Sequence, residues 1–307
     1  MFQFVYWLRA IAAVMITNSH YADIWPISAM AFGGHFGNCI YFFLSGFCLY
    51  NIQESFPRWY AKRIIRIYPA LWIVAAVNLL TGFWGADGIM AYVHCLFYPT
   101  WYHFITSIML LYLVFYAFLV YLVAYIFACD KSYYHIDDVS EKWCRFQFMA
   151  SMLLGAVLRE RYDRINERIT SLDITGFIAG LVLYFVGKKS LGKFDDISQF
   201  QCILPMIQVL LIYSTGTIFI KLEKGGIFAK AGNAIQGIVT FIAGISLEIY
   251  LGQALIITRL NFLTFPLSFV VVTGLILIYA YLVHKLAQLI QKPCSKLLKT
   301  RQKETAQ

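Results

Sequence analysis

Stretches of apolar residues repeat along the whole chain and are separated by short polar segments. A helix needs about 20 predominantly apolar residues to cross a hydrocarbon core about 30 Å thick. The segments that fit this pattern lie at residues 4–22, 30–50, 67–83, 101–128, 145–158, 172–187, 201–220, 237–257 and 265–285. The pattern therefore predicts an all-α, polytopic transmembrane helix bundle with about 9–10 spans.

The composition also indicates that lipid is the main solvent. The chain is 60% hydrophobic and 13% charged, whereas a soluble domain carries about 25% charged residues. No stretch remains for a sizeable soluble domain, so residues 1–307 are predicted to form a single integral membrane domain with no fused soluble domain. The first apolar segment has its only cation, Arg9, in its middle, which favours a retained span over a cleaved signal peptide.

Cations gather in four places, which are three short segments between the apolar stretches and the tail. By the positive-inside rule these segments face the cytoplasm of a multi-pass protein, and we expect a bacterial inner membrane. The clusters are Arg58, Lys62, Arg63 and Arg66; Arg159, Arg161, Arg164 and Arg168; Lys221, Lys224 and Lys230; and the tail from Lys285 to Lys303. Because the net charge of +9 is divided among such segments, nucleic acid is not expected as a partner.

The segment 101–128 conflicts with a simple count of spans. A chain that starts and ends in the cytoplasm crosses the membrane an even number of times, whereas nine apolar segments are present. This segment is too long for one upright helix and too short for two ordinary ones, so it is predicted to be strongly tilted or folded back as a hairpin.

The seven cysteines are scattered and include no CxxC pair, so the sequence predicts neither a zinc site nor a disulfide framework. We expect no bound metal.

Arg9 and His20 are the first candidates for a functional site, because ionisable residues inside a hydrophobic span are costly. Their spacing of eleven residues places them on one helix face, about 16 Å apart along the axis. That geometry suits a long, thin ligand with polar ends. Alternatively, Arg9 extends to the cytoplasmic headgroups and His20 lies at the outer interface.

A second group of candidates follows in an aromatic span punctuated by small residues. His35 lies near its outer end, and Ser45 precedes Gly46. Close helix packing explains Gly46 without any function. A role for His35 in the site and a role as a satisfied interface histidine are about equally supported.

Arg63 and Arg66 stand three residues apart on one face of a predicted interfacial helix over residues 58–68, with Trp59 and Tyr60 as interface anchors. Two guanidinium groups on one face match the phosphate oxygens of a coenzyme A or nucleotide tail. Contact with anionic lipid headgroups is the alternative.

Three of these elements together carry a resemblance to a known family. They are Leu8 to Ala13 with His20, then Phe42 to Phe47 (FFLSGF), then Arg63 to Pro69 (RIIRIYP). In this order and spacing they resemble the opening third of the membrane acyltransferase-3 family, which includes O-acetyltransferases of surface polysaccharides. Phe148 to Gly155 resembles the family's short helix ending in glycine, and residues 244–253, with Ser246 and Tyr250, resemble its late serine-and-tyrosine helix.

The resemblance implies transfer of an acyl group, usually acetyl, from cytoplasmic acetyl-CoA or another acyl-CoA to a hydroxyl of a glycan or glycolipid. In that reaction Arg63 and Arg66 would hold the CoA phosphates, Arg9 would guide the pantetheine arm, and His20 would act as general base. Ser45, Ser246 or Tyr250 would supply hydrogen-bond donors to the oxyanion, and His35 and Tyr112 are further pocket candidates. Both direct transfer and an acyl-histidine relay agree with these roles.

Two departures from the family pattern favour alternatives. The late motif ends in Gln253, where many members have histidine, and residues 101–128 contain no carboxylate, where many members have a glutamate beside the counterpart of Tyr112. A degraded, non-catalytic scaffold is therefore one alternative. A transporter or flippase for a glycolipid or acyl group is another, with Arg9 and His20 lining a polar path. Membrane lipid and a separate extracytoplasmic protein are the other partners considered.

Overall fold

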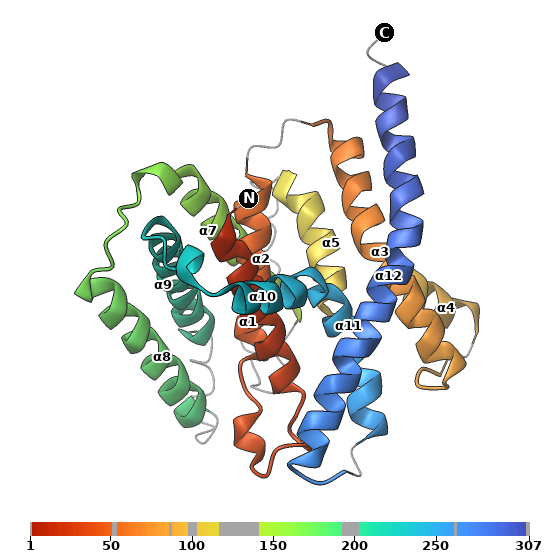
Figure 1. Ribbon diagram of the computed structural model, residues 1–307, viewed down its shortest axis with the longest axis horizontal. Coiled ribbons are helices and arrows are strands. Elements are labelled where there is room, and N and C mark those ends of the chain that lie inside the picture. Colours follow the sequence, from red (N-terminus) through yellow and green to blue (C-terminus); the bar gives the residue numbers. More distant parts are fainter. Residues whose placement is uncertain are drawn as a thin grey trace. The chain divides into compact units, whose positions relative to one another are not determined.

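The computed structural model describes residues 2–50, 54–85, 88–97, 103–116, 141–191, 203–260 and 263–304. Every regular element within these ranges is helical (Figure 1). The predicted all-α class is confirmed.

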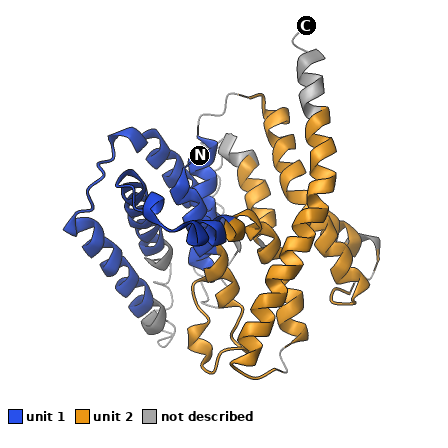
Figure 2. Ribbon diagram, viewed as in Figure 1, with its two compact units in different colours: residues 1–12, 35–51, 113–240 blue, residues 13–34, 52–112, 241–307 orange. Residues whose placement is uncertain are grey.

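The chain forms two compact units that alternate along the sequence (Figure 2). Unit 1 contains residues 1–12, 35–51 and 113–240, and unit 2 contains residues 13–34, 52–112 and 241–307. Because each unit draws on three separate parts of the chain, the units are not successive sequence domains. The single membrane domain stays a prediction.

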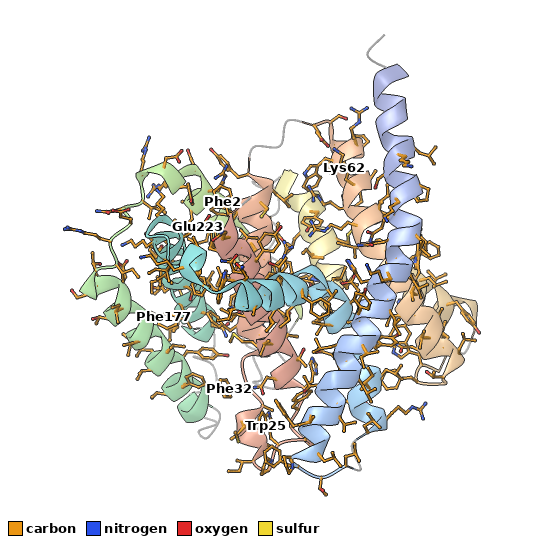
Figure 3. All side chains as sticks on the ribbon, viewed as in Figure 1. Phe2, Trp25, Phe32, Lys62, Phe177 and Glu223 are labelled. Carbon is orange, nitrogen blue, oxygen red and sulfur yellow. The ribbon has the colours of Figure 1, made fainter. Side chains whose placement is uncertain are left out.

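Unit 1 is built from helices whose apolar faces pack on one another. It holds the start of α1 (Gln3–Ser19), together with α2 (Gly34–Leu49), α7 (Glu141–Glu160), η2 (Tyr162–Arg164), α8 (Ser171–Leu191), α9 (Ile203–Lys224), η4 (Phe228–Lys230) and most of α10 (Asn233–Gly244). Helix α9 packs against both α8 and α7. The carboxylate of Glu223 accepts the backbone N–H groups of Gln3 and Phe4, which caps the start of α1 (Figure 3).

Two glycines allow α2 and α7 to approach closely. A Cβ atom added at Gly46 would lie 1.7 Å from the carbonyl oxygen of Met152, and one added at Gly155 would lie 2.0 Å from that of Phe43. The packing role predicted for Gly46 is confirmed. Helix α7 does not end at Gly155, however, and continues to Glu160, because this glycine serves packing and not helix termination.

Unit 2 is organised around a trio of packed helices. Helix α12 packs against α11 and α3, and these two also contact each other. The elements are η1 (Ser28–Met30), α3 (Phe56–Leu80), α4 (Ile89–Leu96), most of α5 (His103–Tyr116), α11 (Ser246–Arg259) and α12 (Leu267–Glu304), preceded by the end of α1. Helices α3 and α12 lie side by side and run in opposite directions (Figure 1).

Helix α3 corrects the prediction of a separate interfacial helix over residues 58–68. It runs without a break from Phe56 to Leu80 and contains the buried Pro69. Apolar helices tolerate an internal proline when neighbouring helices cover it, which is why this proline does not end the element. Trp59 is 3% exposed, so it is a core residue and not the interface anchor that was predicted.

The predicted span over residues 237–257 is not one continuous helix. It is divided into α10 and α11, which meet at an angle of 70°. Ile245 stands between them with non-helical backbone angles, and the hydroxyl of Ser246 donates to the carbonyl of Ala243 at 3.0 Å. That hydrogen bond satisfies one of the carbonyls that the break leaves without a helical partner.

Three described helices are long and apolar enough to cross a membrane: Phe56–Leu80, Met206–Lys224 and Leu267–Leu297. A fourth span results if α10 and α11 count as one. These helices support a membrane protein, but the described residues do not reach the predicted number of about 9–10 spans. Helix α5 covers only part of the segment 101–128, and residues 117–128 lie outside the described residues.

Candidate active site

His20 lies just past the end of α1, which stops at Ser19 and not at residue 22 as predicted. Its backbone N–H donates to the carbonyl of Thr17 at 3.1 Å, a tight final turn. Its side chain is exposed, and no described residue hydrogen-bonds the ring. The imidazole is therefore available to an added substrate.

The segment around His20 is fixed by its neighbours. Tyr21 shares a hydrogen bond of 2.8 Å with Thr273 of α12, and its ring meets that of Phe269 edge-on. The side chain of Asn18 donates to the carbonyls of Met30 and Phe32, which holds the loop after α1. His20 is thus anchored through Tyr21 to the first part of α12.

Arg63 and Arg66 occupy different environments on α3. The half-buried guanidinium of Arg63 lies 5.4 Å from the ring centre of Trp59 and 5.9 Å from that of Tyr112. Such cation–π stacking orients the planar group before a ligand arrives. Arg66 is exposed, and its backbone carbonyl accepts a hydrogen bond of 3.0 Å from Gln291 of α12. Tyr112, predicted as a pocket residue, is therefore a direct neighbour of Arg63.

The distance between the His20 segment and the arginine pair can be measured along helix α12, because both contact it. Thr273, beside Tyr21, and Gln291, beside Arg66, are 18 residues apart, which corresponds to about 27 Å along a helix. This is close to the thickness of a hydrocarbon core, about 30 Å. The histidine and the arginine pair lie toward opposite ends of one apolar helix.

The late serine-and-tyrosine helix contributes buried polar groups from α11. The hydroxyl of Tyr250 accepts the backbone N–H of Phe104 at 3.4 Å, and the two rings pack at 5.0 Å. Ser246 already donates its proton to Ala243 at the helix break. Gln253 is 1% exposed, and its side-chain oxygen has no partner among the described residues.

Three predicted residues belong to unit 1. Arg9 is half-buried on α1, Ser45 is half-buried on α2, and His35 begins a buried polar chain. Nε2 of His35 lies 2.6 Å from the side-chain oxygen of Gln147, whose amide group in turn donates to Gln208. Both glutamines are 1% exposed. The site roles of Arg9, Ser45 and His35 stay predictions.

Sequence reasoning missed a second polar chain, in unit 2, in which Glu248 is buried while His284 and Gln288 are half-buried. Glu248 of α11 is 4% exposed, and its Oε1 atom lies 2.8 Å from Nδ1 of His284 on α12. Nε2 of the same imidazole lies 2.9 Å from the amide nitrogen of Gln288. Both ionisable residues fall inside predicted spans, 237–257 and 265–285, so the rule that identified Arg9 and His20 also applies to them.

No group of three or more metal-ligating side chains occurs among the residues that the structure describes. The set around His284 combines one carboxylate, one imidazole and one amide, and the set around His35 combines one imidazole with amides. They fit proton exchange and hydrogen bonding.

The arrangement thus combines a stacked arginine, an exposed imidazole and buried hydroxyl and carboxyl groups within apolar helices. Comparison with family models matches residues 2–285 to the acyltransferase domain of the acyltransferase-3 family. The chain belongs to this family. Neither the comparison with curated proteins nor the comparison with solved structures finds a match. The predicted family is confirmed, and the chain is accordingly a membrane acyltransferase.

Proposed function

We propose that this acyltransferase moves an acyl group, most simply acetyl, from cytoplasmic acyl-CoA to a hydroxyl of a cell-surface or lipid-linked carbohydrate. The C–S bond of the thioester breaks and a C–O bond forms, while a proton passes from the hydroxyl to the thiolate. His20 is the general base, and Arg63 and Arg66 bind the CoA phosphates. Membrane lipid, a glycan acceptor and a bacterial inner membrane complete the proposal.

The environment of Arg63 is the observation that carries this proposal. A guanidinium stacked on Trp59 and Tyr112, with the exposed Arg66 one turn away, presents oriented donors to an anion. Lys62, which stands next to Arg63 in the sequence, already pairs with Glu54. A simple lipid anchor would need no aromatic support of this kind, because mobile surface cations suffice for attraction to anionic headgroups.

The separation of about 27 Å along α12 between the arginine end and the histidine end supports a donor that is long and thin. Phosphates bound at Arg66 leave the pantetheine arm to extend along the helix trio toward Tyr21 and His20. An acceptor approaching from the other face would then meet the thioester inside the membrane. This is the geometry that transfer across a membrane requires.

The transport alternative draws on one structural feature, the bend between α10 and α11. Secondary transporters place broken helices at corresponding positions in two repeats. The described residues contain one such break, and the sequence contains no internal repeat. Family membership therefore favours acyl transfer.

Two measurements test the proposal. Purified acyltransferase in detergent or liposomes, given acetyl-CoA and an acceptor glycan, should release free CoA thiol and acylate the glycan. Mass spectrometry of surface glycans from cells with and without the gene should show an acyl increment only when the gene is present. Identical glycan masses in both strains, with no thiol release, would overturn the proposed function.

A further inference from the structure

We propose that Lys292 and Lys296 of α12 bind the 3′-phosphate of coenzyme A and make the acyltransferase selective for the complete coenzyme. This inference rests on the proposed function, in which Arg63 and Arg66 bind CoA phosphates, and it extends the same donor site. It begins from the hydrogen bond of 3.0 Å that Gln291 of α12 donates to the backbone carbonyl of Arg66. That bond places this part of α12 beside Arg66.

The two lysines stand together on an accessible face of α12. Lys292 follows Gln291 directly, and Lys296 comes four residues later. Residues four apart share one face of a helix, so the two ammonium groups are one turn apart. Both lysines are exposed, and so is Arg66. A ligand in solvent therefore reaches these side chains without entering the helix bundle.

Helix α12 is long enough to carry these lysines out of the hydrocarbon core. It has 38 residues, Leu267–Glu304, or about 57 Å, whereas the core is about 30 Å thick. The end of α12 and the start of α3 lie at the same end of unit 2 (Figure 1). Because the two helices run in opposite directions, the step from Gln291 to Lys296 leads the same way as the step from Arg66 to Arg63. The lysines thus lie at the polar end of the donor site, away from the pantetheine arm.

The basic face is separate from the main apolar stripe of α12. Leu286, Ile290 and Leu297 are exposed and share one stripe, whereas Lys292 lies about 200° around the helix from Ile290. On the lysine face the exposed Leu289 comes one turn nearer the membrane, so this face changes from apolar to basic close to the level of Arg66. Both lysines lie beyond residue 285, where the match to the family model ends, so family membership does not account for them.

The charges of the ligand and the site also match. CoA carries a diphosphate and, on its ribose, a phosphate monoester of about −1.5 to −2 charges at pH 7. The arginine pair can balance the diphosphate, which leaves the monoester in need of further cations. Among the described residues no carboxylate pairs with Lys292. Like charges four residues apart on a helix repel each other, and a phosphate bound by both lysines would remove that repulsion.

Dephospho-CoA, which lacks only the 3′-phosphate, isolates the proposed contact. The acyltransferase is reconstituted in nanodiscs of neutral phosphatidylcholine and titrated calorimetrically with CoA and with dephospho-CoA. The parent should bind CoA about 10-fold more tightly or better, because hydrogen bonds between charged groups are strong. Lys292→Gln combined with Lys296→Gln should weaken CoA binding to the level of dephospho-CoA and leave dephospho-CoA binding unchanged. Lys292→Arg, which retains a cation, should keep most of the preference.

Lys285→Gln is the matched control, because Lys285 lies seven residues before Lys292 on the same helix and stacks on Tyr281 at 5.2 Å. It should leave both affinities unchanged. Each single lysine variant should lose part of the preference, and the single variants decide if the combined variant does not fold.

Three results would overturn the inference. The first is equal binding of CoA and dephospho-CoA by the parent, and the second is weaker binding of both ligands by the combined variant, which marks a general electrostatic effect. The third is a preference for CoA that persists without the two lysines, which would leave them to lipid headgroups. If the parent binds neither ligand and releases no thiol from acetyl-CoA, the proposed function itself fails, and this inference fails with it.

Discussion

His20 is the residue on which the acceptor chemistry depends most directly. Its exposed ring makes no hydrogen bond to a described residue, so removing it should cost the fold little. We predict that His20→Ala lowers glycan acylation by about 100-fold or more, the usual contribution of a general base. Expression level and thermal stability in detergent should remain those of the parent.

The matched control for this change is His94→Ala, which alters a histidine of α4. It should leave acylation intact. Sustained glycan acylation in well-expressed His20→Ala cells would remove the catalytic role of this histidine and would leave Arg9 without its expected counterpart.

Arg63 and Arg66 should differ in how they tolerate substitution, because only Arg63 is stacked. We predict that Arg63→Ala raises KM for acyl-CoA about 10-fold or more, the cost of losing a charged hydrogen bond of about 1.5–3 kcal/mol. Lysine at position 63 should recover little, since it lacks the planar fork, and lysine at position 66 should recover more. Trp59→Leu should raise KM about 2- to 5-fold through loss of one ring.

Calorimetric titration with CoA measures these differences directly. If Arg63→Ala and Arg66→Ala both bind CoA as tightly as the parent, the two arginines contact lipid headgroups and the donor site lies elsewhere.

For single residues, the sequence identified candidate functional side chains but not the side chains that contact them in the fold. The motif around Arg63 was visible, yet its contact with Tyr112 depends on how α5 packs on α3, which no local pattern encodes. Glu248 and His284 are 36 residues apart and meet only because α11 and α12 are antiparallel and adjacent. Ionisable residues in apolar stretches are detectable from sequence, whereas their pairing is a tertiary property.

At the scale of elements, the crossing of α2 and α7 has little tolerance for added volume. We predict that Gly46→Ala and Gly155→Ala each destabilise the protein by about 1–3 kcal/mol, because the new methyl groups would overlap backbone carbonyls. Thermal inactivation in detergent should show a clear loss of stability for both.

Gly237→Ala on α10 is the matched control, since a Cβ atom there meets nothing within 4 Å. Alanine also favours a helix over glycine, so this variant should be neutral or slightly more stable. Wild-type stability of both crossing variants would mean that α2 and α7 are not held this closely.

The elements also show where hydrophobic pattern stops being informative. The hydrophobic pattern located α3 and α12 because both contain long apolar runs. It wrongly divided α3 near Pro69, where packing by neighbouring helices allows the helix to continue. The same pattern merged α10 and α11 into one segment. The break at Ile245 changes the direction of the backbone, but the residues around it are apolar, so the hydropathy does not change there.

For the whole molecule, the proposed reaction requires the arginine pair on the side that holds CoA and the loop after His20 on the other side. Unit 2 supports this requirement, since Arg66 and Tyr21 contact α12 at points about 27 Å apart along the helix. The positive-inside rule predicts, from the basic residues between 58 and 66, that the arginine end faces the cytoplasm. The prediction concerns Ser55, which precedes α3, and Ser28, in the loop between α1 and α2; both are exposed.

After the seven native cysteines are replaced, single cysteines at these two serines report the topology. In intact cells an impermeant maleimide should label Ser28→Cys, whereas Ser55→Cys should react only after the membrane is permeabilised. Permeabilised cells, in which both positions should react, provide the control for intrinsic reactivity. Equal labelling of both from outside would separate Arg63 and Arg66 from cytosolic acyl-CoA, and a donor site at α3 would then be impossible, whatever the chemistry of His20.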